Sequence, residues 1–208
     1  MKRKAYRAYL RLLFGACLIL IFGLTGISPL QASTFGGRAY SAFVNVPSLG
    51  AGPVYISDTG ELSPGGWQSA ALSDTSIPTV LSAGVLVAAT VGATYVTTGD
   101  KADSSTSLAD LVVLPGNPAQ ITASFVRAQT QVTASGVNGY SEIYDLTFGG
   151  VTVAVTGQAN QTVTIPGVAT LTINEQATSS GAITVNALHL VLLGGGEVIV
   201  SSARSSIF

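Results

Sequence analysis

Few side chains of this chain have the types and spacing that catalysis requires. His189 is the only histidine, and it lies between two leucines in a run too apolar to line a solvent-filled cleft. Nucleophilic catalysis needs a base beside an activated hydroxyl or thiol, and the sequence has neither a G-x-S-x-G elbow nor a cysteine other than Cys17. One histidine cannot supply a multi-histidine metal site. We therefore predict a hydrogen-bonded structural histidine, no cofactor, no metal and no enzyme activity.

Two aspartates near the middle of the chain are the next candidates. Asp100 and Asp103 offer carboxylate oxygens of the kind that bind calcium. Their spacing does not match an EF-hand loop, however, and Lys101 between them opposes a cation. The segment 98–107 is polar and charged, so we predict a loop with solvated charges there.

Glu142 and Asp145 are the only close acidic pair in the second half of the chain. Two carboxylates facing one pocket would suit glycoside hydrolysis. These two are three residues apart in a predicted strand, so their side chains should point to opposite faces. One pocket cannot use both.

Trp67 is the only tryptophan, and it follows two glycines. An exposed tryptophan can stack on a sugar ring, with Tyr140 and Tyr144 as further aromatic candidates. Trp67 can equally close one end of a β-sandwich. It is the one ligand-stacking candidate that the sequence supplies.

The first 32 residues have the three-part layout of a secretory signal peptide. A basic start precedes an uncharged apolar run over 12–27, and a Pro-containing segment then ends at Ala32. We predict a signal-peptide helix with cleavage after Ala32. The apolar run is shorter than the roughly twenty residues that span a bilayer, and an uncleaved N-terminal anchor is the alternative. Cys17 lies inside this leader, so a thiol or disulfide is not expected in the mature protein.

Cleavage changes the charge of the protein. Four Lys and Arg against ten Asp and Glu remain after residue 32, which gives a net charge of −6. So few cations cannot neutralise many phosphates, and this argues against nucleic acid and anionic lipid as partners. The expected partners are the protein itself or components of the cell envelope or matrix, in a secreted or surface location, and no membrane after cleavage.

The composition favours an all-β fold. Charged residues make up 9% of the chain, against roughly a quarter in ordinary domains, and Val, Ile, Thr, Ser, Ala and Gly replace them. Short alternating segments bounded by turns indicate strands. We predict one domain over 33–208, a β-sandwich or jelly roll, with a barrel as the alternative.

The second half carries the clearest strands. A strand over 119–134 changes its buried face near Arg127, which indicates a bend or bulge. Two alternating runs joined by Gly149-Gly150 are typical of a hairpin. The predicted strands of this half are 119–134, 141–148, 151–156, 161–165 and 168–175, followed by two apolar runs around the glycines 194–196.

The first half has weaker patterns. Strands are expected over 38–46 and 54–57, one or two core strands over 77–98 and a short apolar element over 108–114. The segment 61–76, which contains Pro64 and a Gly-Gly pair, is predicted to be a long loop.

The C-terminal block also carries a family resemblance. The motifs are Thr164-Ile165-Pro166-Gly167-Val168, Leu171-Thr172-Ile173-Asn174-Glu175-Gln176, Thr184-Val185-Asn186-Ala187-Leu188-His189 and Gly194-Gly195-Gly196-Glu197-Val198-Ile199-Val200-Ser201-Ser202-Ala203. They resemble the choice-of-anchor P family of secreted bacterial proteins, closely over 119–207 and more faintly over 38–114. The resemblance implies an exported β domain and no established chemistry. Relatives often have a cysteine where Arg204 stands, so any family disulfide is lost here, and the sorting anchor expected after the domain is not seen.

These features predict an exported, non-catalytic structural protein of the cell surface or extracellular matrix. Self-association by strand exchange is expected: the strand 38–46 follows a flexible lead, 33–37, and would pair with an open sheet edge of a neighbour. The alternative is a secreted adhesion module that binds a glycan or protein through Trp67.

Overall fold

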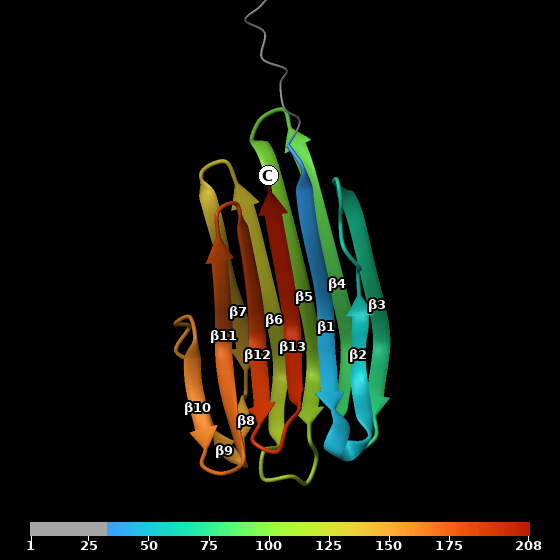
Figure 1. Ribbon diagram of the computed structural model, residues 1–208, viewed down its shortest axis with the longest axis vertical. Coiled ribbons are helices and arrows are strands. Elements are labelled where there is room, and N and C mark those ends of the chain that lie inside the picture. The colour runs from blue at the N-terminus through green and yellow to red at the C-terminus, as the bar shows by residue number, and fades with distance from the viewer. Residues whose placement is uncertain (1–32) are drawn as a thin grey trace, which may run out of the picture. The chain divides into compact units, whose positions relative to one another are not determined.

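The computed structural model describes residues 33–208, which form two antiparallel β-sheets packed face to face (Figure 1). Sheet A has the strand order β10-β11-β12-β13-β1-β2, and sheet B has the order β3-β4-β5-β6-β8-β9, with β7 also paired to β6. The predicted all-β sandwich is confirmed. The predicted leader and its cleavage site, the alternative anchor and Cys17 lie outside the described residues.

The strand bounds follow the chain in order. They are β1 Phe35–Val46, β2 Ala51–Asp58, β3 Gly66–Ile77, β4 Leu81–Tyr95, β5 Gly99–Val113, β6 Ile121–Thr133, β7 Gly136–Tyr144, β8 Thr147–Phe148, β9 Val151–Thr152, β10 Gln161–Ile165, β11 Ala169–Ser179, β12 Ala182–Leu192 and β13 Glu197–Ile207, with one 3-10 turn, η1, at Pro47–Leu49.

Most strands of the second half lie close to where the sequence places them, but the strand predicted over 141–148 is divided into β7, which begins at Gly136 and ends at Tyr144, and β8. The Gly149-Gly150 turn joins β8 to β9, and both glycines have positive φ angles, 61° and 79°. Two successive positive φ angles are typical of the type I′ hairpin turn, and glycine adopts them without steric cost. The strand predicted over 151–156 is shorter than expected, because only its first two residues pair with β8.

Two predicted loops are wrong. The segment predicted as a loop over 61–76 contains most of β3, and the loop predicted over 98–107 is the first half of β5. In this half of β5 the buried positions are Ala102, Ser104 and Thr106, so buried and exposed residues do alternate, but the buried ones are small or carry hydroxyls. β3 is an edge strand that pairs only with β4, and most of its residues are exposed. Neither strand has the apolar alternation that makes strands visible in a sequence.

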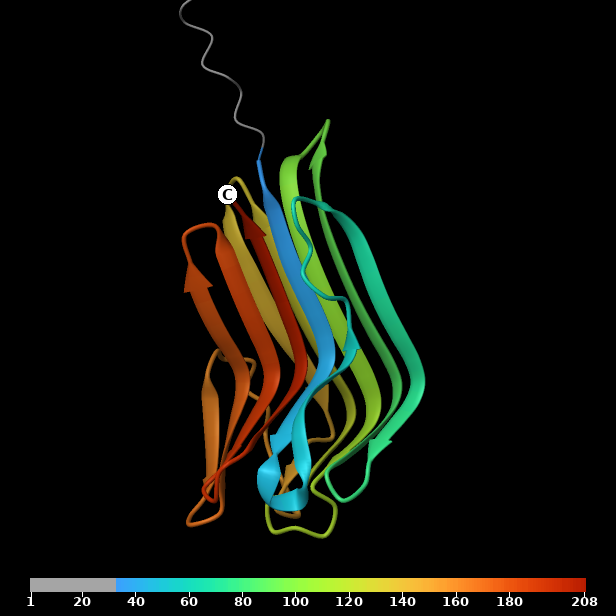
Figure 2. The same ribbon diagram turned by 45° about the vertical axis from the view of Figure 1, so that its right-hand side comes forward.

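Both sheets bend at the same level (Figure 2). At this level most strands either have a residue with a positive φ angle or have two consecutive side chains that point to the same face of the sheet instead of alternating. Positive φ is rare for residues other than glycine and changes the direction of the strand; among the described strands the register at the bend shifts only between β4 and β5, where a bulge lies. The residues with positive φ at the bend are Ser57, Asn174 and Ser201 in sheet A, and Val85, Asp110 and Asp145 in or beside sheet B.

The direction of the bend is shared by the two sheets. The bend residues of sheet A are buried and point toward sheet B, whereas Val85, Asp110 and Asp145 are exposed and point away from sheet A. Both sets therefore project in the same direction in space, so the two sheets bend together and stay in contact. In β6 the buried face changes between Ala123 and Val126, close to the change predicted near Arg127.

The bend divides the interior into two parts. On the side that contains the β12–β13 turn, large aliphatic side chains such as Leu171, Leu188 and Leu111 fill the core. On the other side, buried hydroxyls replace many of them. The hydroxyl oxygens of Thr90 and Ser104 lie 2.7 Å apart, Ser205 donates to Ser104 at 3.1 Å, and the hydroxyls of Thr130 and Ser205 lie 2.8 Å apart.

This chain of hydroxyls joins β4, β5 and β6 of sheet B to β13 of sheet A. Ser104 Oγ also donates to the carbonyl oxygen of Arg204 at 2.5 Å. Buried polar groups are stable only when they are hydrogen-bonded, and here each hydroxyl has a partner. Small side chains let the two sheets approach closely in this half.

Candidate functional site

Trp67 lies on the outer face of sheet B, near the start of β3, with 68% of its side chain exposed. The prediction that it sits in a loop is wrong, and so much exposure excludes a role as a plug at the end of the sandwich. In the strand register Trp67 pairs with Val91, and Val91 pairs with Asp103. These side chains border a hollow of about 80 Å³ whose floor includes Ala89 and Ser105.

A row of polar side chains continues from this hollow across β5 and β6, and two of them, Asp103 and Gln129, line it. Asp103 accepts a hydrogen bond from Gln131 Nε2 at 2.9 Å and forms an ion pair with Lys101 Nζ at 2.8 Å. Gln129 Oε1 accepts hydrogen bonds from Arg127 Nη2 and from the Tyr140 hydroxyl, both at 2.7 Å. The side chains are therefore held in place before any ligand binds.

The two tyrosines named with Trp67 lie on the same outer face. Tyr140 belongs to the polar row through its hydroxyl. Tyr144 is more exposed and stacks on Phe125, with ring centroids 5.8 Å apart. The outer face of sheet B thus has aromatic side chains at both of its edges, with small and polar side chains between them.

The acidic pairs do not form a joint site. Glu142 lies 3.5 Å from Arg127 Nη1 on the outer face of sheet B. Asp145 is exposed at the bend and accepts a hydrogen bond from Ser124 Oγ at 2.5 Å. The two were predicted to point to opposite faces, but the positive φ of Asp145 turns its side chain to the solvent side.

Asp100 and Asp103 are also separated, at different positions along β5. Asp100 accepts hydrogen bonds from the hydroxyls of Ser33 and Thr94, and these bonds, that of Ser33 first, hold the pKa of Asp100 below its usual value. Asp103 pairs with Lys101. The predicted solvated loop is thus a strand with paired charges. Within residues 33–208, no group of three or more His, Cys, Asp or Glu side chains is placed to hold a metal ion.

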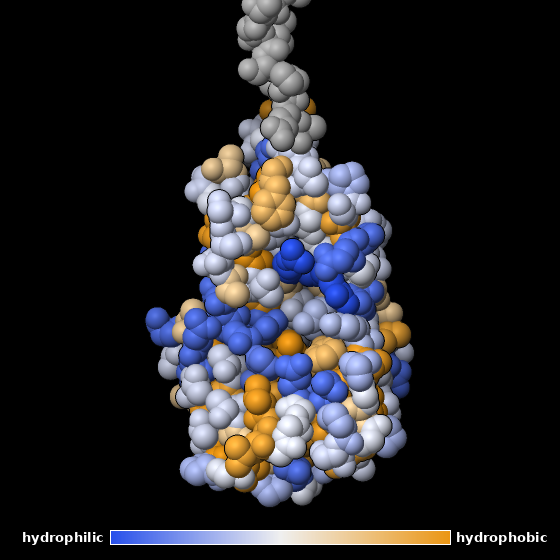
Figure 3. All heavy atoms as spheres, viewed as in Figure 1, coloured by the Kyte–Doolittle hydropathy of each residue, from blue (hydrophilic) through white to orange (hydrophobic). Residues whose placement is uncertain are grey.

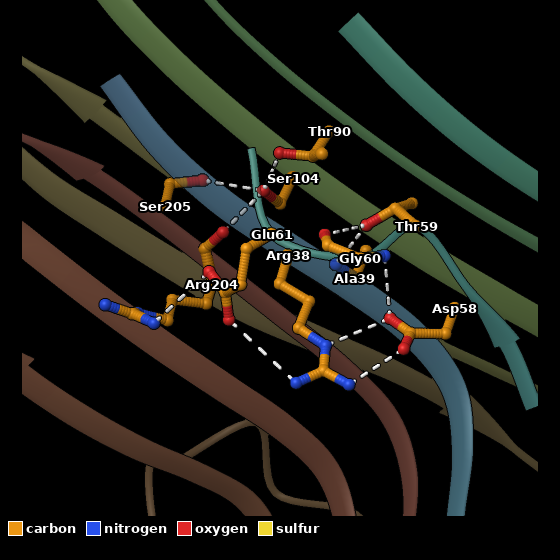
Figure 4. Close-up of polar contacts among 10 residues, drawn as sticks. All are labelled: Arg38, Ala39, Asp58, Thr59, Gly60, Glu61, Thr90, Ser104, Arg204 and Ser205. Carbon is orange, nitrogen blue, oxygen red and sulfur yellow. Dashed lines mark hydrogen bonds and ion pairs between the residues drawn. The ribbon is translucent and has the colours of Figure 1, made fainter. Parts of the chain in front are cut away.

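The outer face of sheet A carries a second polar cluster, which the sequence did not reveal. Hydrophilic side chains form a band across the middle of this face (Figure 3). At the β1–β2 side of the face, Arg38 donates to Asp58 from Nε at 3.0 Å and from Nη2 at 2.7 Å (Figure 4). Its guanidinium also lies over the ring of Tyr55, 4.2 Å from the centroid. Glu61 extends the cluster to Arg38 at 3.9 Å and to Arg204 at 3.6 Å.

This cluster fixes the connection between the two sheets. Desolvation opposes ionisation of Asp58, but the bonds from Arg38 and from the Gly60 backbone N–H outweigh it, so the pKa of Asp58 is lowered. The hydrogen bond to Asp58 is also the main reason that the pKa of Arg38 is raised. Burial, partly offset by a hydrogen bond to Ser202, raises the pKa of Tyr40, which lies beside Arg38. A bidentate Arg–carboxylate pair is a strong and well-oriented contact, so this cluster holds the loop after β2 against β1.

His189 lies on the outer face of sheet A, across the bend from Glu175 and on the same side of the bend as Glu197. Its Nδ1 is 3.0 Å from Glu175 Oε2, and its Nε2 is 3.2 Å from Glu197 Oε2. Asn186 Nδ2 donates to the same Glu175 oxygen at 2.6 Å. The prediction of a hydrogen-bonded histidine is confirmed. Both ring nitrogens face carboxylates rather than a hydroxyl that they could activate, which is a structural arrangement.

A larger hollow, of about 260 Å³, lies at the turns that end β10 and β12. Ile165, Val168, Leu192 and Leu193 contribute to its lining, and it has no charged side chain. Polar groups that would orient a ligand are few there, so we assign it no chemistry.

Comparisons with known proteins do not identify the chain. No protein-family model matches it, and no curated protein or solved structure matches it either. Among residues 33–208, no helix is both long enough and apolar enough to cross a membrane. The site therefore has to be interpreted from its own geometry.

Proposed function

We propose that this protein is an exported, non-catalytic structural protein of the cell surface or extracellular matrix that associates with further copies of itself through strand β3. The observation that carries the proposal is the exposed edge of β3, which is twelve residues long and pairs on one side only. An edge strand presents unpaired N–H and C=O groups to a neighbour. The signal-peptide layout of residues 1–32 supports export.

The other sheet edges are better protected than β3. β2 is shorter and carries Pro53, β10 has five residues and β9 has two. β7 contains two glycines and Glu142. Proline, charge and short length are the means by which proteins prevent edge-to-edge pairing. β3 contains no proline, and its one charged residue is Asp74.

The sequence of β3 suits antiparallel pairing with itself. A twofold axis through Leu72 places Trp67 opposite Ile77 of the second copy and Asp74 opposite Ala70. Like charges do not meet in this register. An axis perpendicular to the sheet also preserves the direction of the bend.

One carbonyl group at the edge of β3 already accepts a hydrogen bond within the protein. Ser57 Oγ in β2 donates to the carbonyl oxygen of Ala70 at 3.1 Å, which shows that this carbonyl points away from β4. A carbonyl oxygen has two lone pairs, so it can still accept a bond from a neighbouring chain.

β1 is less suitable for donation than the sequence predicts. The segment 35–37 is not a flexible lead but the start of β1, which pairs with β13 on one side and β2 on the other. A donated β1 would have to leave both ladders first. For this reason we place the contact between copies at β3.

Leu72→Lys tests the proposal, because it places two like charges on the proposed twofold axis. The mature protein is expected to show concentration-dependent dimers in sedimentation velocity, and the variant is expected to be monomeric. Leu72 is 44% exposed, so a lysine there can reach solvent. Leu193→Lys, in the exposed β12–β13 turn, is the matched control and should associate like the wild type.

Two results would contradict the proposal. One is a wild-type protein that stays monomeric at millimolar concentration. The other is a Leu72→Lys variant that keeps its native circular dichroism spectrum and associates as strongly as the wild type.

A further inference from the structure

The outer face of sheet B has the features of a ligand platform. Trp67 and Val91 form an apolar border, and Ala89 and Ser105 form a low floor beside it. Gln129 follows on β6, in register with Ser105. Neighbouring strands are about 4.8 Å apart, so the distance from β3 to β6 is roughly 14 Å, which leaves room for more than one sugar ring across the strands.

The chemical types on this platform match a carbohydrate. A pyranose ring has faces made of C–H groups, which pack on an aromatic ring, and an edge of hydroxyls, which both donate and accept hydrogen bonds. Trp67 supplies the aromatic surface. The Asp103 carboxylate on β5 and the amides of Gln129 and Gln131 on β6 supply acceptors and donors.

The charges of the platform indicate the class of carbohydrate. Lys101 is paired with Asp103 at 2.8 Å, and Arg127 lies 3.5 Å from Glu142. The cations of this face are thus matched by anions beside them. At the bend, Asp110 and Asp145 add exposed negative charge to the same face. An anionic polymer would be repelled, whereas a neutral one would not.

From this geometry we propose that the outer face of sheet B binds a neutral polysaccharide, with Trp67 stacking on a sugar ring and Asp103, Gln129 and Gln131 bonding its hydroxyls. The small floor and the polar side chains on β5 and β6 favour a sugar over a peptide, because peptide-binding surfaces place large apolar side chains at their centre. This site does not depend on pairing of β3 between copies, although Trp67 belongs to that strand.

The sole tryptophan gives a direct measurement. Trp67 fluorescence is titrated with hydroxyethylcellulose, xyloglucan, glucomannan and dextran, and with alginate as the anionic comparison. The titration uses the mature protein and is repeated in the Leu72→Lys background, so that changes in association are separated from binding. We expect saturable quenching or a blue shift with at least one neutral polymer, the same in both backgrounds, and none with alginate.

Variants then test the named side chains by affinity electrophoresis in gels that contain the neutral polymer bound in the titration. Trp67→Ala is expected to weaken binding by about tenfold or more, and Trp67→Phe should retain part of the affinity. Gln131→Ala should weaken binding by several fold. Leu193→Ala, which also removes an exposed side chain but on a turn of sheet A, should bind like the wild type.

Several outcomes would overturn the proposal. They are an unchanged tryptophan spectrum with every neutral polymer, binding of alginate alone, and neutral-polymer affinity that Trp67→Ala leaves unaltered. Trp67-dependent capture of extended peptides without binding of any polysaccharide would assign the face to a protein partner instead. Circular dichroism of each variant, with Trp67→Phe as the milder change, separates loss of binding from loss of fold.

Discussion

Gly37 of β1 and Thr90 of β4 face each other so closely across the interior that a Cβ atom on Gly37 would overlap the Thr90 hydroxyl. The same added atom would lie 3.0 Å from Ser104 Oγ. Gly37 therefore sets the distance between the sheets in the half where buried hydroxyls replace aliphatic side chains.

Gly37→Ala is expected to lower the free energy of unfolding by about 1–3 kcal/mol, because overpacking forces neighbouring groups to move. Chemical denaturation followed by circular dichroism measures the change. Gly52→Ala is the control, since an added Cβ there meets nothing within 4 Å, and its stability should equal or slightly exceed that of the wild type. Equal stability of Gly37→Ala and the wild type would show that the sheets separate easily at this point.

Val85→Asn is expected to stabilise the protein. Val85 has a φ of 40° and is 63% exposed, and a left-handed conformation costs a residue with a branched Cβ about 1–2 kcal/mol. Asparagine tolerates this conformation better. The melting temperature should rise by about 2–4 °C. Val87 is an exposed residue of β4 outside the bend, and Val87→Asn should not raise the melting temperature. A fall in melting temperature with Val85→Asn would show that Val85 is not strained at the bend.

The Arg38–Asp58 pair makes stability depend on pH in acid. The pKa of Asp58 is lowered in the folded protein, against about 3.9 in an unfolded chain. Its contribution is therefore complete above about pH 5 and is lost as the pH falls through the unfolded value toward the folded one. Asp58→Asn should lower the free energy of unfolding by about 1–2 kcal/mol near neutral pH. Between pH 5 and pH 2.5 the free energy of unfolding of this variant should fall less than that of the wild type.

Urea denaturation across this pH range gives the comparison. Asp110→Asn is the control, because Asp110 is exposed and asparagine also tolerates its φ of 51°. If Asp58→Asn and the wild type lose stability in parallel on acidification, the ion pair is not the source of the pH dependence.

Strands with apolar alternation could be predicted from the sequence, and strands without it could not. β11 and β12 bury Leu171, Ile173, Leu188 and Leu190, so a period of two is plain. In the first half of β5 the buried residues are Ala102, Ser104 and Thr106, and the inner and outer faces of this segment have similar polarity. Such a strand is recognised only when the facing sheet is known.

The candidate site could be predicted in part. As the only tryptophan, Trp67 is a stacking candidate from the sequence alone, although the sequence leaves open whether it is exposed. Its neighbours Val91, Asp103 and Gln129 come from three other strands. Their proximity depends on the register of sheet B, which local sequence patterns do not determine. The alternating glutamines 129 and 131 were the available signal, since long polar side chains on one face of a strand mark a solvent-facing surface.

The first and last described residues meet at one end of the sandwich, between the inner strands β1 and β13. The backbone N–H of Thr34 donates to the Phe208 carbonyl at 2.8 Å, and that of Phe208 donates to the Thr34 carbonyl at 2.9 Å. Tension applied between the two ends of the described chain would break the hydrogen bonds between β1 and β13 one residue pair at a time. Within the ladder, Phe35 and Ile207 would separate first. Tension applied along β3, from neighbour to neighbour, would load many hydrogen bonds together in shear. A fibre or mat joined through that edge would resist stretching better than the single molecule resists being pulled by its ends.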